Sequence, residues 1–293
     1  MEFVRSLLET AVEAARAAGE IHRSFAGRVA LADATEKGPS DFVSHVDLRA
    51  QAAASEVILT NFPDHRILSE EEAPADASPA VVTLTDLESA PPEGPATPPL
   101  WIVDPLDGTT NFLHGHPLYA ASVGVTVAGR PVAGAVAAVA SDECWWAAKG
   151  EGAFRNGVRI RSSQVRTARE ALVGTGFPFK RMAELPRFLR QMQHVLPATS
   201  GIRRGGSAAL DLCFLAQGSL DAFWECHLEP WDVAAGLIIL EEAGGMATRI
   251  GGGALEVRRP GSVLAGNSEE LMQVLDALLA AAESGDDFGD AGP

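Results

Sequence analysis

The stretch WIVDPLDGTTNF, residues 101–112, places two carboxylates where a strand is expected to be still half buried. Its apolar start leads directly into Asp104, and Asp107 follows three residues later. Two further acids, Glu70 and Asp232, also border apolar residues in distant parts of the chain. Taken singly, each of these acids is expected to be a helix cap or a turn residue.

Taken together, the four acids favour a different interpretation. Buried carboxylates repel one another, so they must be protonated, paired with cations or bound to a metal ion. The sequence around them contains few Lys or Arg residues. Oxygen ligands without His or Cys select Mg²⁺, Mn²⁺ or Ca²⁺ rather than Zn²⁺. Because Mg²⁺ commonly shares its coordination sphere with phosphate, the pattern predicts phosphate chemistry more than a structural calcium site.

Other chemical motifs are absent from the sequence. It contains neither the GxxxxGK[ST] phosphate loop nor the GxSxG nucleophile elbow, and His114-Gly-His116 is expected to be a surface loop. The net charge of −16 argues against direct binding to nucleic acids or to anionic membranes. An anionic substrate would therefore need local positive charge, which two divalent ions would supply.

The cysteines and the first residues bear on the compartment. Cys144, Cys213 and Cys226 form no CxxC pair, so we expect a reduced, cytoplasmic protein without disulfides. The first 22 residues carry charges throughout and match neither a signal peptide nor a membrane span.

Hydrophobic periodicity predicts the elements that must position the acids. Apolar residues recur at helical spacing over 2–25, which predicts a long amphipathic helix. A second helix is expected over 48–60, with Asp47 as its N-cap, and a short strand over 66–68. Strands and helices then alternate irregularly: strands at 121–127, 132–140, 143–148, 171–175, near 202 and 220–225, and helices at 182–195, 207–217, from Pro230 to Gly244-Gly245, and 268–282. This pattern predicts layered α/β sheets with much antiparallel pairing.

One domain is expected over residues 1–282. Residues 73–99 are rich in Ala, Pro, Asp and Glu, which predicts a partly mobile surface insertion. The last helix is expected to open at Asn267, with Glu270 in capping-box register, and the acidic tail 283–293 is expected to be disordered.

Several motifs in the same order resemble one known family. Residues 104–112, DPLDGTTNF, resemble the first signature of the inositol monophosphatase family, and residues 231–236, WDVAAG, resemble its second. Further stretches are similar to its mobile loop, its intervening acidic element and its bacterial branch: 37–47, 67–71, 174–180 and 203–211. The resemblance spans about residues 1–280 and implies an α/β fold, a layered αβαβα sandwich, usually as a homodimer.

The resemblance also implies a role for each matching residue. Two to three Mg²⁺ ions per site would be held by four side chains and one backbone carbonyl: Glu70, Asp104, the carbonyl of Leu106, Asp107 and Asp232. Asp47 and Thr109 would help to orient and activate a metal-bound water, Glu70 would also be catalytic, and the N–H groups of Gly108 and Thr109 would bind phosphate. The alcohol part of the substrate would face Arg203, Gly206, Ser207, Ala208 and Glu225.

Some of these residues have simpler interpretations. Thr109 can cap a helix as well as act in catalysis, and Glu225 can pair with an arginine. Arg203 and Arg204 can both be solvated surface charges, although Arg203 matches the substrate-side position of the family. Residues 73–99 are longer than their family counterpart, and their position between Glu70 and Asp104 places them at the rim of the site or near a dimer edge.

The function implied is Mg²⁺-dependent, Li⁺-sensitive hydrolysis of myo-inositol monophosphates, with a small phosphorylated polyol as substrate. Related phosphatases act on histidinol phosphate, fructose 1,6-bisphosphate or 3′-phosphorylated nucleotides, and these remain alternatives. A different class of function is a non-catalytic role in transcription antitermination, through a protein partner. Substitution of Asp104 by Asn would separate the two classes, since only hydrolysis should be lost.

Overall fold

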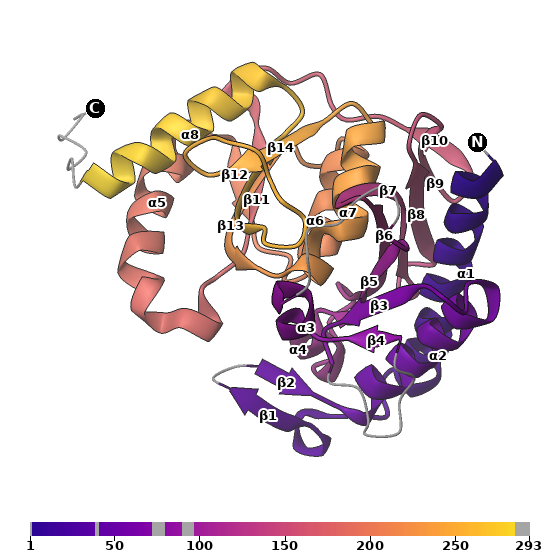
Figure 1. Ribbon diagram of the computed structural model, residues 1–293. Coiled ribbons are helices and arrows are strands. Elements are labelled where there is room, and N and C mark those ends of the chain that lie inside the picture. Colours follow the sequence, from indigo (N-terminus) through magenta and orange to yellow (C-terminus); the bar gives the residue numbers. More distant parts are fainter. Residues whose placement is uncertain (1, 39–40, 72–79, 90–96, 285–293) are drawn as a thin grey trace.

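The computed structural model describes residues 2–38, 41–71, 80–89 and 97–284 (Figure 1). Its helices are α1 (Glu2–Phe25), α2 (His45–Asn61), α3 (Leu84–Ser89), α4 (Thr109–Leu113), α5 (Leu185–Ala198), α6 (Ala208–Ala216), α7 (Pro230–Glu242) and α8 (Glu269–Ser284), with 3₁₀ turns at Leu31–Asp33, Ala168–Glu170 and Phe179–Glu184. Its strands are β1 (Thr35–Gly38), β2 (Asp41–Val43), β3 (Arg66–Ser69), β4 (Val81–Val82), β5 (Leu100–Asp107), β6 (Ala120–Val127), β7 (Arg130–Ala138), β8 (Glu143–Ala148), β9 (Gly152–Arg155), β10 (Val158–Ile160), β11 (Leu172–Thr175), β12 (Gly201–Arg203), β13 (Ala222–Leu228), β14 (Met246–Arg249) and β15 (Gly261–Gly266).

Two sheets carry the fold, and a short hairpin, β1–β2, stands apart from them. The larger sheet has eight strands in the order β10-β9-β8-β7-β6-β5-β3-β4. Its strands are antiparallel except at one edge, where β3 runs parallel to both β5 and β4. The smaller sheet has five strands in the order β12-β11-β13-β15-β14.

Helices separate and cover the two sheets. Helices α1 and α2 pack on the outer face of the larger sheet, α6 and α7 lie between the sheets, and α5 and α8 cover the smaller one (Figure 1). One buried apolar cluster joins α6 and α7 to both sheets, and two others lie beneath the outer helices on either side. The expected layered α/β architecture, in the order αβαβα, is therefore confirmed.

Helix α1 follows the predicted range of 2–25. Its buried positions repeat at helical spacing and are mostly small: Leu7, Ala11, Ala14, Ala15 and Ala18. Because alanine side chains are short, the helix lies close to the sheet, and its last buried residue, His22, reaches the strand that carries the acids.

Helix α7 is brought close to the larger sheet by two glycines. Gly124 and Gly134 are cross-strand partners on β6 and β7. A Cβ atom at Gly124 would lie 2.8 Å from the backbone of Ala234, and one at Gly134 would lie 2.8 Å from that of Ala235. The sheet therefore accepts the helix at short range, and the N-terminus of α7 is held near the end of β5 (Figure 1).

Two predicted helix starts were wrong. Helix α2 begins at His45 with Ser44 as its N-cap, and Asp47 is the third helical residue, whose carboxylate accepts from the Ser44 N–H. Helix α8 begins at Glu269, where the Ser268 hydroxyl accepts from the Leu271 N–H. Asn267 instead donates to the Val165 carbonyl. In both cases a serine, with its short side chain, takes the capping position.

Part of the predicted insertion at 73–99 is regular structure. Val81-Val82 adds β4 to the edge of the larger sheet, and Leu87 of α3 is buried. Residues 72–79 and 90–96, as well as the tail from 285 on, lie outside the described residues. The mobility of the insertion and the disorder of the tail remain predictions. Among the helices of the described residues, none has the length and apolar character needed to cross a membrane.

Candidate metal centre and active site

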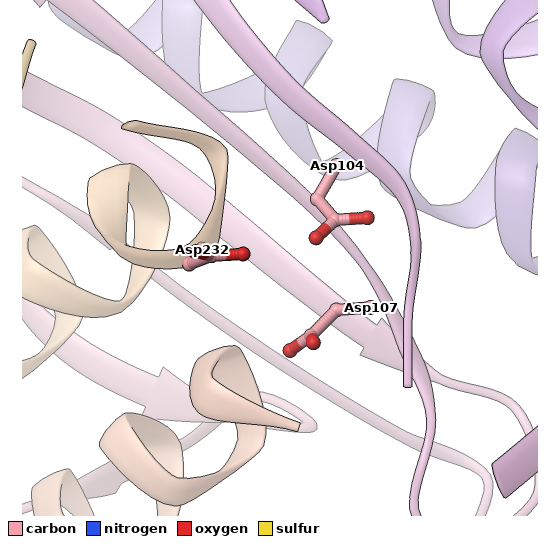
Figure 2. Close-up of side chains that lie close together, drawn as sticks. All are labelled: Asp104, Asp107 and Asp232. Carbon is pink, nitrogen blue, oxygen red and sulfur yellow. The ribbon is translucent and has the colours of Figure 1, made fainter. Parts of the chain in front are cut away.

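The predicted acids meet near the carboxyl ends of the neighbouring strands β3 and β5 of the larger sheet. Strands β3 and β5 are parallel and in register, with Ser69 opposite Val103, so Glu70, the residue after β3, lies level with Asp104 of β5. Asp232 lies in the first turn of α7. Figure 2 shows that the carboxylates of Asp104, Asp107 and Asp232 point toward one another, although they come from a strand and a distant helix.

These three aspartates form a compact group. Carboxylate oxygens of Asp104, Asp107 and Asp232 lie within 4.8 Å of one another. Burial, reinforced by the charges of Glu70, Asp107 and Asp232, raises the pKa of Asp104 well above its ordinary value. Burial and then the Asp107 charge do the same for Asp232. The fold thus holds like charges together at a cost that a divalent cation would offset.

Asp107 is held by the start of α6. Its Oδ2 atom accepts from the Ser207 hydroxyl at 2.6 Å and from the Ala209 N–H at 2.8 Å. Ser207 is also the N-cap of α6, because its hydroxyl accepts from the Leu210 N–H. Burial raises the pKa of Asp107 to about 6, and these hydrogen bonds limit the rise. Ser207 therefore has a definite contact within the protein, while its predicted contact with substrate remains a prediction.

Asp47 and Thr109 lie together, as expected. The Thr109 hydroxyl is 3.1 Å from Asp47 Oδ1 and 2.9 Å from the carbonyl oxygen of Leu106. Asp47 is fully buried, and burial raises its pKa despite hydrogen bonds from Ser44 and Thr109. Because a hydroxyl has one hydrogen, Thr109 can donate to one of these two oxygens at a time and can accept from a third partner.

Glu70 lies beside the aspartates and is paired with a lysine. Lys37 Nζ is 2.8 Å from Glu71 Oε1 and 3.7 Å from Glu70 Oε1. The expectation of few cations near the acids was therefore wrong at this point, since β1 brings Lys37 in from a distant part of the chain. Burial nevertheless raises the pKa of Glu70 to about 7, so Lys37 offsets the desolvation only in part.

Gly108 is required by the turn after β5. Its φ of +89° lies in the left-handed region, and an added Cβ atom would come within 2.8 Å of the Leu118 carbonyl oxygen. Asn111, one helical turn further, donates to the carbonyls of Leu118 and Gly205. The turn is thereby fastened to the loop that contains Gly206 and precedes Ala208 at the start of α6.

Arg203 and Arg204 differ in what their side chains contact, and the predicted contact of Arg203 with substrate remains a prediction. Arg203 is exposed, and its side chain donates to the carbonyl of its own neighbour Ile202. Arg204 is also exposed, and its guanidinium lies over the rings of Phe177 and Phe179 at 5.3 and 5.1 Å. Its charge also lowers the pKa of Glu225, which burial raises to about 8.

Asp211 was missed by sequence reasoning. It is 2 % exposed in α6, and burial and then the Asp107 charge raise its pKa well above the ordinary value. Its spacing gives a usable signal, because Asp211 follows the N-cap Ser207 by four residues and so faces the same side of the helix start. A carboxylate on that side is unexpected within the apolar sequence of α6.

The oxygen atoms that could bind a metal at this site suit a hard divalent cation. Within the described residues, hydrogen bonds to the three clustered aspartates reach Asp104 Oδ1, Asp107 Oδ2 and Asp232 Oδ2. One oxygen of each carboxylate is therefore oriented by the protein, and the other can face an ion. All the available ligand atoms are carboxylate or carbonyl oxygens, which suits Mg²⁺, Mn²⁺ or Ca²⁺ and does not suit soft metals.

The layered fold and the carboxylate cluster define a class: α/β phosphatases that depend on metal ions. The inositol monophosphatase family profile matches residues 4–284, and the chain belongs to this family.

Relatives carry more than one functional name. The chain is 38% identical to the fructose-1,6-bisphosphatase/inositol-1-monophosphatase of Aquifex aeolicus, over 86% of this chain and 88% of that one. It is 38% identical to an inositol-1-monophosphatase of Mesorhizobium japonicum, over 93% and 96% of the two chains. It is 35% identical to the Nus factor SuhB of Pseudomonas aeruginosa, over 94% and 96%.

Solved structures agree with the fold. The suhB protein of Bartonella henselae superposes with a TM-score of 0.80 at 35% identity, covering 92% of this chain and 97% of that one. An inositol monophosphatase of Thermotoga maritima gives a TM-score of 0.79 at 30% identity, covering 94% and 98%. The family resemblance inferred from the motifs is thereby confirmed.

Proposed function

We propose that this phosphatase hydrolyses myo-inositol monophosphates to inositol and phosphate in a Mg²⁺-dependent reaction. The observation that carries the proposal is the buried cluster of Asp104, Asp107 and Asp232, with its oxygens within 4.8 Å of one another. Oxygen ligands suit Mg²⁺, which commonly binds phosphate at the same time. The relative from Mesorhizobium japonicum, named inositol-1-monophosphatase, supports the choice of substrate.

The metal ions would be held by Glu70, Asp104, the carbonyl of Leu106, Asp107 and Asp232. Bound there, two to three ions would neutralise phosphate charge and lower the pKa of a water molecule.

The other residues act on water, phosphate and alcohol. Thr109, hydrogen-bonded to the buried Asp47, would accept a hydrogen bond from the attacking water and hold its lone pair toward phosphorus. The N–H groups of Gly108 and Thr109 would bind phosphate oxygens. Because burial raises the pKa of Glu225 to about 8, its carboxyl group is largely protonated at neutral pH and can donate to a hydroxyl of the substrate.

The test is phosphate release from a panel of esters, each measured with Mg²⁺ and with a chelator. Inositol monophosphates should give the highest kcat/KM, and chelation should abolish release. Asp104→Asn should lower kcat by about 10²–10³-fold, the order seen when one group that stabilises transition-state charge is removed. Higher kcat/KM for histidinol phosphate or a 3′-phosphorylated nucleotide would overturn the substrate assignment.

Fructose 1,6-bisphosphate is the second candidate substrate. The name of the Aquifex aeolicus relative includes this activity. The Arg204 guanidinium, fixed over Phe177 and Phe179 near Glu225, could pair with a second phosphate on the substrate. Arg204→Ala would then lower kcat/KM for the bisphosphate more than for inositol monophosphate. Equal effects on both esters would count against a role for the second phosphate.

A role in transcription antitermination, through a protein partner, is the candidate from another class. The relative from Pseudomonas aeruginosa is named as a Nus factor. Partner binding should survive Asp104→Asn, because the substitution alters a buried carboxylate and leaves the surface unchanged. Loss of both activities in a folded Asp104→Asn protein would argue against separate functions.

We further propose a cytoplasmic homodimer with Li⁺-sensitive activity. Free thiols at Cys144, Cys213 and Cys226 support a reducing compartment. Large apolar side chains are exposed at Phe179, Met182 and Leu189, which supports burial against a second copy. Light scattering after size-exclusion chromatography measures the mass, and a monomer at micromolar concentration would refute the dimer.

A further inference from the structure

The loop between Asp104 and Asp107 lacks regular strand pairing. Asp104 pairs with Ser122 and Asp107 with Ala120, so β5 uses three steps where β6 uses two. The extra residue forms a bulge, and the peptide groups inside it cannot follow the ladder. Buried backbone groups need other partners, so the hydrogen bonds of this loop can be followed one by one.

Three side chains supply those partners. The Leu106 N–H donates to Asp104 Oδ1 at 3.0 Å, and the Leu106 carbonyl accepts from the Thr109 hydroxyl at 2.9 Å. The Pro105 carbonyl oxygen lies 2.7 Å from Nε2 of His22. Asp104 and Thr109 belong to the signature motif itself, whereas His22 comes from α1, 83 residues earlier.

The direction of the His22 hydrogen bond follows from its partner. A carbonyl oxygen can only accept, so Nε2 must carry the hydrogen. Nδ1 is buried and has no hydrogen-bond partner among the described residues, so a hydrogen on Nδ1 would be unsatisfied. Burial lowers the pKa of His22 to about 4, which agrees with a neutral ring whose single hydrogen is on Nε2.

The ring cannot easily move away from this position. His22 is completely buried, and its ring packs against Phe112 and Tyr119 at centroid distances of 6.1 and 5.9 Å. Both aromatic residues follow the acidic loop in the chain and pack together at 5.0 Å. The imidazole is therefore fixed by the same part of the structure that it contacts.

One planar peptide group connects His22 with a clustered aspartate. The Pro105 carbonyl and the Leu106 N–H belong to the same rigid plane. His22 holds its oxygen side, and the carboxylate of Asp104 is bound to its N–H side. A rotation of this plane would move the Leu106 N–H away from Asp104 Oδ1 and so release the orientation of the Asp104 carboxylate.

We propose that His22 is a positioning residue for the metal site: its Nε2–H fixes the Pro105–Leu106 peptide and, through it, the carboxylate of Asp104. This inference rests on the proposed function, in which Asp104 and the Leu106 carbonyl bind Mg²⁺. His22 touches neither substrate nor ion. Its contribution is to metal affinity, in the way that outer hydrogen-bond partners orient the ligands of other metal sites.

The experiment compares Mg²⁺ binding in the full-length wild type, His22→Leu and His22→Gln by calorimetric titration. Leucine fills the space without a donor, whereas the glutamine Nε2 restores an N–H donor at similar reach. His22→Leu should raise the Mg²⁺ dissociation constant by about 10-fold or more, the order found for outer partners of metal ligands. His22→Gln should bind Mg²⁺ nearly as tightly as the wild type.

Leu7→Ala is the matched control for a purely structural effect. Leu7 is a buried residue of the same helix that packs in the cluster shared by α1, α2 and the larger sheet. Leu7→Ala should lower the melting temperature in chelator but leave the Mg²⁺ dissociation constant unchanged. His22→Leu should in addition reduce the increase in melting temperature that Mg²⁺ produces, since that increase depends on affinity.

The possible results separate the inference from the proposed function. Wild-type Mg²⁺ affinity in His22→Leu would overturn the inference and leave the metal site intact. Equal weakening in His22→Gln and His22→Leu would also overturn it, because the hydrogen bond would then not be the cause. Failure of the wild type to bind Mg²⁺ would refute the metal site itself, and the role of His22 with it.

Discussion

The chelated protein should lose stability as the pH rises from 6.5 to 8.0. The reason is that its buried carboxyl groups prefer the protonated state in the fold: burial raises the pKa of Glu70 to about 7 and that of Glu225 to about 8. In the unfolded chain both groups are ionised throughout this range. The folded state therefore holds more protons than the unfolded state, and deprotonation weakens the fold.

The sign and size follow from these two pKa values. A carboxyl group with a raised pKa contributes stability below its unfolded pKa and loses it as the pH passes through the folded pKa. One pKa unit corresponds to about 1.4 kcal/mol, so the partial titration of Glu70 and Glu225 across this window removes about 2 kcal/mol. Asp104, Asp211 and Asp232 have pKa values raised in the same direction and add to the loss.

The range from pH 6.5 to 8.0 limits the contribution of the buried histidine, His22, to the change in stability. Burial lowers the pKa of His22 to about 4, so His22 has the opposite effect and destabilises the fold as the pH falls below 6.5. Above pH 6.5 this residue is neutral in the fold and at most half protonated in the unfolded chain, so its opposing contribution is small and declines as the pH rises. The carboxyl groups then dominate the measured change.

The assay is urea unfolding at fixed ionic strength in EDTA, at pH 6.5, 7.0, 7.5 and 8.0, followed by circular dichroism. Glu225→Gln is the matched variant, since it removes the larger share of the titration and should reduce the fall to about 1 kcal/mol. Mg²⁺ should also reduce the fall, because metal binding favours deprotonated ligands. A free energy of unfolding that stays constant or increases across the window would refute this account of the buried acids.

Three substitutions test how the site is held. Gly108→Ala should cost about 2 kcal/mol or more in thermal unfolding and abolish phosphate release, because the φ of Gly108 is +89° and the new Cβ would lie 2.8 Å from the Leu118 carbonyl oxygen. The control is Gly115→Ala, with a φ of +69° and open space around the new Cβ, which should cost about 1 kcal/mol. Thr109→Ala should lower kcat about 100-fold with little change in KM. Thr109→Ser keeps the hydroxyl bound to Asp47 and should retain most of the activity. Equal losses of activity in both variants would exclude a role for the hydroxyl. Ser207→Ala removes the N-cap of α6 and the 2.6 Å hydrogen bond to Asp107. Calorimetry should therefore show weaker Mg²⁺ binding together with a stability loss of about 1 kcal/mol. Unchanged Mg²⁺ affinity would show that Asp107 is oriented without Ser207.

Local signals in the sequence predict much of this fold. The helical spacing of apolar residues gives α1 its observed bounds, and alternation with turn residues gives the hairpin of β6 and β7. Such elements are determined by residues close together in the chain, so periodicity is sufficient. The start of α2 was predicted wrongly because Ser44 and Asp47 are both good capping residues, and which one occupies the cap depends on the backbone that enters the helix.

The candidate site could be predicted only in part for the same reason. Asp104 and Asp107 are recognisable as acids at the end of an apolar run, and motif order places Asp232 with them. The partners of these acids come from distant segments: Lys37 from a hairpin, Arg204 from the loop before α6, and His22 from α1. No local pattern indicates such contacts, because they arise from the packing of layers.

The acidic character of the chain and an anionic substrate are compatible only if cations bind before phosphate. A phosphate monoester approaching this site meets the carboxylates of Glu70, Asp104, Asp107 and Asp232, within a protein of net charge −16. Lys37 is already engaged with Glu70 and Glu71, so this lysine offsets charge on the protein rather than on the substrate. The N–H donors of Leu106, of the start of α6 and of Glu229, the residue before α7, orient the aspartates but leave their pKa values raised. The hydrogen bonds therefore arrange the ligands without offsetting the cost of their burial as anions, and a divalent ion that displaces their protons would offset it. Once that charge is balanced, the same cluster that would repel phosphate becomes the surface that binds it.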